Sequence, residues 1–421
     1  MTTFSTTHES SITAEKQTFE PGKNYKWRIC ALLFMATTIN YVDRHVFSIL
    51  APELQIAFQW DEITYGYIVT AFQLAYALGF LGMGNFMDRR GVRWGYPIAV
   101  LLWSTAAVSH SLARSAFGFG LARFGLGLGE SGNFPAALKT VAEWFPEKER
   151  ALATGIFNSG ANIGAIIAPL LVPWIAIQWG WQWAFLATGM LGFLWIPFWL
   201  SVYKRPVFTE TTTEKIKWSH LFHYKAAWAF ILGKFLTDPV WWFYLYWLPK
   251  FLYQEHEITL DKIGPPLVII YVVSDIGSIV GGWLSSTMIK KGWSVNTARK
   301  FTMLLCVLSI LPIYFASQTS DLWTAVAFIS IATAAHQGWS ANLFTIVTDV
   351  FSKSSVGSVI GLGGTAGALG GMLLAFSAGY LITWTHSYDI LFMIAASAYA
   401  VALLLIHLLL PVIRPINVSK L

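Results

Sequence analysis

Apolar runs of about 20 residues recur along almost the whole chain, separated by short polar stretches. Each run is long enough to cross roughly 30 Å of hydrocarbon as an α-helix. The pattern predicts an all-α membrane protein with about twelve transmembrane helices. Their expected spans are 25–50, 63–87, 93–112, 117–141, 150–174, 182–203, 226–252, 264–289, 299–317, 321–348, 356–382 and 388–412.

The composition agrees with this interpretation. Of the 421 residues, 55% are hydrophobic and 12% are charged, whereas a soluble domain carries roughly 25% charged residues. Such a chain cannot cover itself with polar surface, which excludes an ordinary soluble globular protein.

The basic residues predict how the chain is oriented. The loops that follow the even-numbered spans hold most of the lysines and arginines, whereas the opposite loops hold only Arg114, Lys250 and Lys262. Basic loops stay on the cytoplasmic side, so both termini are expected there. The net charge of +6 is thus mostly a topology signal and does not require a nucleic-acid partner.

The chain divides into two halves. We predict a disordered cytoplasmic tail (1–24), which does not resemble a cleavable signal peptide, a six-helix bundle (25–203), a cytoplasmic linker (204–225), a second six-helix bundle (226–412) and a short cytoplasmic tail (413–421). An offset of 206 residues aligns "EWFPEKERALATG" with "DVFSKSSVGSVIG" and places Glu130 opposite His336. "APEL" after the first span likewise resembles "LPKF" after the seventh. Repeats of this kind predict a substrate site between the bundles, near the bilayer midplane.

Ionisable residues occupy two of the predicted membrane helices. The first span contains Asp43, Arg44 and His45 in succession, and the fourth contains Arg123 and Glu130. Each charge at mid-membrane costs roughly 2.5–3.5 kcal/mol, which favours a functional role. Neighbours on a helix point about 100° apart and cannot pair. We therefore expect Asp43 near Arg123 and Arg44 near Glu130, because Arg123 and Glu130 share one helix face.

These charges suggest how a proton and an anion could travel together. Two acids and two bases sum to zero, and burial favours the neutral form of a carboxyl group. Once Glu130 is protonated, Arg44 is free to bind a substrate carboxylate through two hydrogen bonds. We assign proton coupling to Asp43, Glu130 and Arg123, and carboxylate binding to Arg44. A static ion-pair network that only holds the helices together remains the alternative.

Other polar side chains at helical spacing could bind the hydroxyl groups of a sugar. The candidate substrate-binding residues besides Arg44 are Tyr41, Gln73, Tyr76, Asn158, His336, Gln337, Trp339, Ser340 and Asn342. For each of them an interhelical hydrogen bond, worth about 0.6 kcal/mol, is the structural alternative. No second ligand stands at zinc spacing from His336, so neither a metal nor another cofactor is expected. The roles of Lys234, Asp238 and Asp275 stay open.

A loop motif connects the chain with a known superfamily. After the second span, "GNFMDRRGVRW" places Gly84, Asp88, Arg89, Gly91 and Arg93 at the spacing of the loop signature of the major facilitator superfamily, which the chain resembles. The glycines would let two helix ends approach closely, and Asp88 could accept hydrogen bonds from a facing helix N-terminus. The resemblance implies a gating role for these five residues.

Further motifs narrow the resemblance. "NYVDR" together with "RFGLGLGESGNFPA" is similar to the anion:cation symporter family, and "KFLTDPVWWFYLYWLP" and "AAHQGWSANLFTIVTDVF" are similar to its bacterial hexuronate branch. The similarity runs from about residue 25 to 412. The glutamine that the galactonate branch carries near the fifth-span polar motif is absent, with Ala161 close by.

This resemblance implies proton-coupled uptake of glucuronate or galacturonate by alternating access, by a monomer in a bacterial inner membrane, with no enzymatic activity. It places Arg44 on the substrate carboxylate, and Asp43 and Glu130 as proton carriers. Another organic anion, such as galactonate, glucarate or an aromatic acid, and anion exchange remain alternatives. A membrane-embedded hydrolase is not favoured, because "GLGLGESG" around Ser131 lacks the strand–turn–helix setting of a serine-hydrolase nucleophile.

Overall fold

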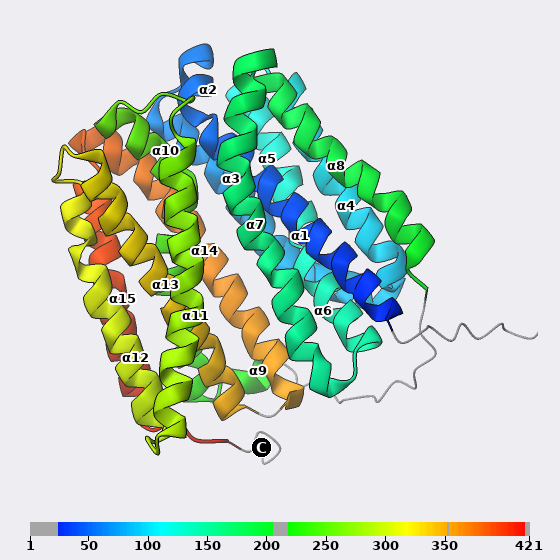
Figure 1. Cartoon of the computed structure of the whole chain (residues 1–421), viewed down its shortest axis with the longest axis vertical. Helices are drawn as coiled ribbons and strands as arrows, with labels where there is room; N and C mark the ends of the chain where they lie inside the picture. The colour runs from blue at the N-terminus through cyan, green and yellow to red at the C-terminus, as the bar shows by residue number, and fades with distance from the viewer. Residues whose placement is uncertain (1–23, 205–217, 352, 417–421) are drawn as a thin grey trace, which may run out of the picture.

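The computed structural model describes residues 24–204, 218–351 and 353–416, and these ranges are helical almost throughout (Figure 1). The first half contains α1 (Tyr25–Ile49), α2 (Ala51–Phe58), α3 (Glu62–Arg90), α4 (Val92–Ser109), η1 (His110–Leu112), α5 (Ala116–Glu130), α6 (Asn133–Trp144), α7 (Glu147–Trp179) and α8 (Trp181–Val202). The second half contains α9 (Trp218–Leu221), α10 (Lys225–His256), α11 (Gly264–Lys290), α12 (Val295–Ile310), η2 (Leu311–Ala316), α13 (Leu322–Val350), α14 (Lys353–Thr385) and α15 (Asp389–Leu409).

Each of the twelve predicted spans coincides with a long helix or with two consecutive ones. The third and ninth spans end in the 3₁₀ turns η1 and η2, and the fourth is divided at Ser131 and Gly132 into α5 and α6. Among the described helices, seven are long and apolar enough to cross a membrane by themselves: α3, α7, α8, α11, α12 with η2, α14 and α15. The others include α1, α5, α10 and α13, which carry many of the buried polar residues.

Local sequence signals set the helix ends. Asp61 caps α3 by accepting a hydrogen bond from the Thr64 amide at 2.8 Å, and Asp321 caps α13 through the Thr324 amide at 2.8 Å. These side chains satisfy backbone donors that a helix start leaves without partners. Gly91, with φ of +73°, makes the sharp turn between α3 and α4, a conformation in which a side chain would be strained.

The two halves of the chain form bundles that are packed in the same way (Figure 1). In the first bundle α1 packs against α7, α3 against α5, and α4 against α8. In the second bundle α10 packs against α14, α11 against α13, and α12 against α15. This correspondence agrees with the internal repeat in the sequence. Most of the predicted linker, 204–225, lies outside the described residues.

The two bundles meet mainly where α3 packs against α14, α7 against α11, and α1 against α10. Very small residues line part of the first contact. A Cβ atom added to Gly66 would lie 3.0 Å from the Ala375 carbonyl oxygen, and one added to Gly379 would lie 2.5 Å from the Glu62 carbonyl oxygen. The backbones of α3 and α14 therefore approach closely near the Glu62 end of α3.

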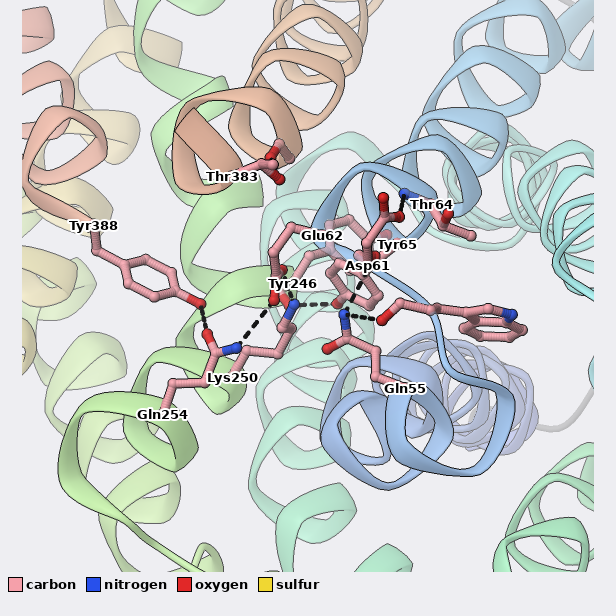
Figure 2. A network of polar contacts seen from close by, with 12 residues as sticks. Gln55, Asp61, Glu62, Thr64, Tyr65, Tyr246, Lys250, Gln254, Thr383 and Tyr388 are labelled. Carbon is pink, nitrogen blue, oxygen red and sulfur yellow. Dashed lines mark hydrogen bonds and ion pairs between the residues drawn. The ribbon is translucent and has the colours of Figure 1, made fainter. Parts of the chain in front are cut away.

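Polar contacts join the bundles at that same end (Figure 2). Lys250 of α10 forms an ion pair with Glu62 of α3, and Gln254 donates to Glu62 at 3.0 Å. Tyr388 in turn donates to Gln254 at 2.6 Å, and the Tyr65 hydroxyl donates to the Tyr246 carbonyl oxygen. We call the Lys250–Glu62 pair the outer latch, because this end faces outside in the orientation that the basic loops predict.

Contacts are sparser towards the other end of α3. Phe80 approaches a Cβ position on Gly364 of α14 only at 3.9 Å, and no atom lies within 4 Å of a Cβ added to Gly82 or Gly84. The close helix approach that we expected at Gly84 is therefore not seen. The bundles are closed at the outer latch and less tightly joined near the predicted cytoplasmic end.

The outer latch generates a prediction about conformation. Among the ion pairs between described residues, Lys250–Glu62 alone connects the two bundles. Replacing Lys250 with Met removes the ion pair and leaves Glu62 bonded to Gln254 alone among the contacts described above, so the outer face should open more often. A cysteine placed at the buried Val69 should then react at least several-fold faster with an impermeant maleimide added from outside.

Two controls accompany this measurement. The Lys262→Met change, in the loop before α11, should leave the labelling rate unaltered, and the parent chain reports any reaction of Cys30 and Cys306. Exchanging the charges by Lys250→Glu together with Glu62→Lys should restore slow labelling. A Lys250→Met variant that reacts no faster than its parent would contradict the latch.

Candidate functional site

Arg44 of α1 and Glu130 of α5 form a buried ion pair between two helices of the first bundle. The Arg44 Nε and Nη2 atoms lie 2.8 and 2.7 Å from Oε2 of Glu130, and the two side chains are 3% and 0% exposed. Within the described part of the chain, Glu130 Oε1 has no hydrogen-bond partner. The predicted pairing of Arg44 with Glu130 is confirmed. Both of these Arg44 nitrogen atoms bond to the same oxygen of Glu130, so the pair does not use the second carboxylate oxygen.

Glycines in "GLGLGE" allow α5 to hold Glu130 at this position. A Cβ atom added to Gly127 would lie 2.4 Å from the Phe72 carbonyl oxygen of α3, and one added to Gly129 would lie 2.6 Å from the Trp103 amide nitrogen of α4. Any side chain at either position would push α5 away from its neighbours. The small residues therefore fix the depth at which Glu130 meets Arg44.

Aromatic rings surround the Arg44 guanidinium. Its Cζ atom lies 4.6 Å from the ring centre of Tyr41, 4.9 Å from Tyr76, 5.2 Å from Trp242 and 5.4 Å from Phe72. The negative faces of such rings stabilise a cation. Trp242 comes from α10, so the guanidinium lies at the seam between the bundles.

The predicted pairing of Asp43 with Arg123 is wrong. Arg123 donates instead to the Arg44 carbonyl oxygen at 3.4 and 3.5 Å and lies 4.8 Å from the rings of Phe47 and Phe72. Among the described residues no short, well-aligned hydrogen bond reaches either Asp43 oxygen, and Thr188 of α8 is a polar neighbour that interacts with this carboxyl group. Because consecutive helix residues point about 100° apart, Asp43 faces α8 when Arg44 faces α5.

His45 points in a third direction. Its Nδ1 atom donates to the Tyr41 carbonyl oxygen at 2.6 Å, and its ring lies edge-on to Tyr271 of α11, with 5.6 Å between ring centres. Asp43, Arg44 and His45 therefore reach three different partners: α8, α5 and the second bundle.

The predicted substrate-binding residues of the first bundle differ in their surroundings. Tyr41 and Tyr76 contact the Arg44 guanidinium directly. Gln73 is completely buried with neither amide atom hydrogen-bonded, and it lies midway between Gly66 and Phe80 on the stripe of α3 that faces α14. Asn158 is exposed on α7.

In the second bundle, His336 of α13 is part of an aromatic cluster. Its ring stacks on Trp241 of α10 with 5.0 Å between centres and 6° between planes, and its Nδ1 atom shares a hydrogen bond with the Tyr399 hydroxyl at 2.5 Å. Gln337 and Ser340 are half-buried on the same helix.

Two further predicted residues of α13 do not fit a substrate role. Trp339 is buried against Tyr399, with 5.5 Å between ring centres. Asn342 is also buried, and its amide donates to the carbonyl oxygens of Gly281 and Gly338 at 3.1 and 2.9 Å. Both side chains are turned towards neighbouring helices of their own bundle. They stabilise the packing of α13. The prediction that they contact substrate does not agree with this orientation.

Several residues around the guanidinium were missed by the sequence reasoning. Trp242 and Phe72 contact Arg44, and Asn40 accepts a hydrogen bond from it at 3.4 Å. Asn40 is one helical turn before Arg44, a spacing that could have identified it. Nothing in the sequence showed which face of α10 carries Trp242.

The loop motif lies between α3 and α4. Gly91 makes the turn, Arg89 is exposed, and the Arg93 carbonyl oxygen accepts a hydrogen bond from Trp199 at 3.3 Å. Lys139 of α6 donates to the Met87 carbonyl oxygen at 3.1 Å and thereby holds the end of α3. The side chain of Asp88 lies outside the described part of the chain.

The chain is similar to characterised transporters. Residues 33–375 match the Major Facilitator Superfamily. The hexuronate transporter of Escherichia coli strain K12 is 31% identical over 382 residues, which cover 85% of this chain and 88% of that protein. The galacturonate transporter of Dickeya chrysanthemi is 30% identical over 305 residues, covering 67% and 88%.

Solved structures share the fold. A bacterial homologue of the human lysosomal transporter Spinster, in an inward-facing and unoccupied conformation, superimposes with a TM-score of 0.73 at 20% identity, covering 92% of this chain and 95% of that one. A D-xylose–proton symporter gives a TM-score of 0.71 at 14% identity, covering 91% and 97%. Together with the paired bundles, the family match and the transporter relatives show that the chain belongs to the major facilitator superfamily and is a membrane transporter rather than an enzyme.

Proposed function

We propose that this protein imports a hexuronate, such as glucuronate or galacturonate, together with protons. The observation that carries the proposal is the Arg44–Glu130 ion pair, buried at the seam of the two bundles. Hexuronate, galacturonate and galactonate transporters among the relatives support a sugar-acid substrate.

The geometry of the pair supports an exchange of carboxylates on Arg44. Glu130 meets the Nε–Nη2 edge of the guanidinium with one oxygen only. A carboxylate that offers both oxygens to that edge forms two parallel hydrogen bonds, which is the stronger arrangement. When Glu130 takes up a proton, it loses its charge and the substrate carboxylate replaces it. The surrounding rings hold the cation in place during the exchange.

Protonation also makes the exchange electrically possible. Asp43 and Glu130 balance Arg44 and Arg123, so an extra anion would leave a buried negative charge. One proton per anion removes that charge. An inside-negative potential opposes anion entry by roughly 2.3 kcal/mol per charge per 100 mV, so a second proton would let the potential drive uptake. Asp43, which is buried and forms no ion pair with another described residue, is the proposed carrier of that proton.

In this scheme Arg123 holds α1 and α5 in place beside the Arg44–Glu130 pair. Its side chain donates to the Arg44 backbone and lies among Phe47, Phe72 and Tyr246. It thus ties α5 to α1 beside the exchanging pair and adds positive charge near Glu130. Its contribution to proton coupling is through this charge and not through a direct pair with Asp43.

A substrate panel tests the proposal as a whole. Purified protein in proteoliposomes should accumulate glucuronate or galacturonate when the outside is more acidic than the inside, and should transport galactonate, glucarate and phosphate less well. Collapse of the proton gradient with an uncoupler should abolish accumulation. Uptake that ignores the gradient would contradict proton symport.

Glu130→Gln should separate coupling from binding. The amide cannot gain or lose a proton, so gradient-driven accumulation should fall at least tenfold. Counterflow should persist, because the neutral amide leaves Arg44 available to the substrate. Glu149→Gln, which removes a peripheral partner of Lys26, is the matched control and should retain accumulation. Full accumulation by Glu130→Gln would remove Glu130 from the coupling mechanism.

Arg44→Lys should weaken substrate binding although it keeps the charge. Lysine offers a point charge in place of a planar fork, so it cannot bind both carboxylate oxygens along one edge. We expect the KM of hexuronate counterflow to rise at least tenfold. Arg114→Lys, at the loop before α5, should change KM by less than twofold. An unaltered KM in Arg44→Lys would show that the carboxylate binds elsewhere.

A further inference from the structure

The internal repeat relates the ion pair of the first bundle to an aromatic pair in the second. An offset of 206 residues places Glu130 opposite His336, and an offset of 197 residues, which aligns Pro52 with Pro249, places Arg44 opposite Trp241. Each pair is in contact within its own bundle: Arg44 is bonded to Glu130, and Trp241 is stacked on His336. Equivalent positions therefore supply charge in one bundle and aromatic surface in the other.

The aromatic pair is held in a defined orientation. The Tyr399 hydroxyl shares a hydrogen bond with His336 Nδ1, and the Tyr399 ring lies edge-on to His336 at 5.9 Å. Trp241 itself is half-buried, whereas Trp242 and Trp247 on the same helix are buried. His336 therefore covers one side of the Trp241 ring, and part of the Trp241 side chain remains accessible.

Trp241 is the sequence neighbour of a residue that contacts the proposed carboxylate site. The next residue, Trp242, has its ring 5.2 Å from the Arg44 guanidinium, and α10 packs directly against α1. Trp241 precedes Trp242 on α10 and points about 100° away from it, towards His336 of α13. In the arrangement proposed next, the body of an Arg44-bound ligand lies beside both rings.

The other charged groups of α10 in this region are already paired. Lys234 and Asp238 form an ion pair at 2.7 Å one turn apart, and a Cβ atom added to Gly367 of α14 would clash with Asp238 at 2.2 Å. The pair neutralises itself within its own helix. What α10 offers next to Arg44 is therefore aromatic surface.

We propose that Trp241, backed by His336, binds the C–H face of a cyclic sugar acid and so selects ring-form uronates over open-chain sugar acids. The inference rests on the proposed function. A pyranose presents a rigid face of C–H groups, which the negative face of an indole attracts. An open-chain acid has no such face and loses more conformational freedom on binding.

Competition experiments on reconstituted protein test this selection. Against labelled galacturonate counterflow, galacturonate should compete at least tenfold better than open-chain galactonate. Trp241→Leu should lower the affinity for galacturonate at least tenfold and that for galactonate less than twofold, so the preference for the ring collapses. Trp241→Phe should retain part of it. Trp283→Leu, an exposed tryptophan on α11, should retain all of it.

A second measurement needs no variant. Methyl galacturonosides, whose rings cannot open, should compete in at least one anomeric form as well as galacturonate does. Two results would exclude Trp241 as the residue that selects the sugar ring. One is that neither anomer competes better than galactonate, and the other is that Trp241→Leu weakens both substrate classes equally. Transport of sugar acids without ring preference would defeat this inference alone, whereas absence of sugar-acid transport by the parent protein would defeat the proposed function.

Discussion

A guanidinium that is removed from water must be compensated by partners within the protein, and the arrangement around Arg44 follows from this requirement. Glu130 supplies the countercharge, and four rings supply a softer, permanent compensation. The rings matter because their attraction for the cation does not depend on whether Glu130 carries a proton. They allow the cation to stay where it is when Glu130 becomes neutral, so that a change of partner does not require Arg44 to leave the seam.

The two bundles divide the work of recognition, although their helices pack alike. The first bundle contains both acids and both bases of the central cluster, and the second contributes Trp242, Trp241 and His336. A ligand that bridges the seam would therefore meet charge on one side and aromatic surface on the other. Such a ligand contacts both bundles at once, which is how binding energy can be coupled to their relative motion.

The sequence predicted the helices, the repeat and the Arg44–Glu130 pair, because hydropathy and helical spacing report these features directly. It failed where the rotation of a helix within its bundle decides the outcome. Asp43 was expected to face Arg123 but faces α8, and Trp339 and Asn342 were expected at the seam but face their own bundle. Trp242 was missed for the same reason. The rotation of a helix about its axis depends on how it packs against all its neighbours, including glycines such as Gly127. The sequence of that helix alone does not determine the rotation.

The contact of α3 with α14 next to the outer latch is made by Gly66 and Gly379, with backbone lying on backbone. Separation of these two glycines parts backbone from backbone, and beside them the ring of Tyr67 would have to leave Phe376 and Tyr380 of α14. Little dispersion energy is concentrated in either glycine. The barrier to opening the seam towards the outside is then shared between the polar bonds of the outer latch and the neighbouring aromatic contacts of Tyr65 and Tyr67. Substitutions around the outer latch could therefore change the turnover rate during evolution without changing the proposed substrate-binding residues around Arg44.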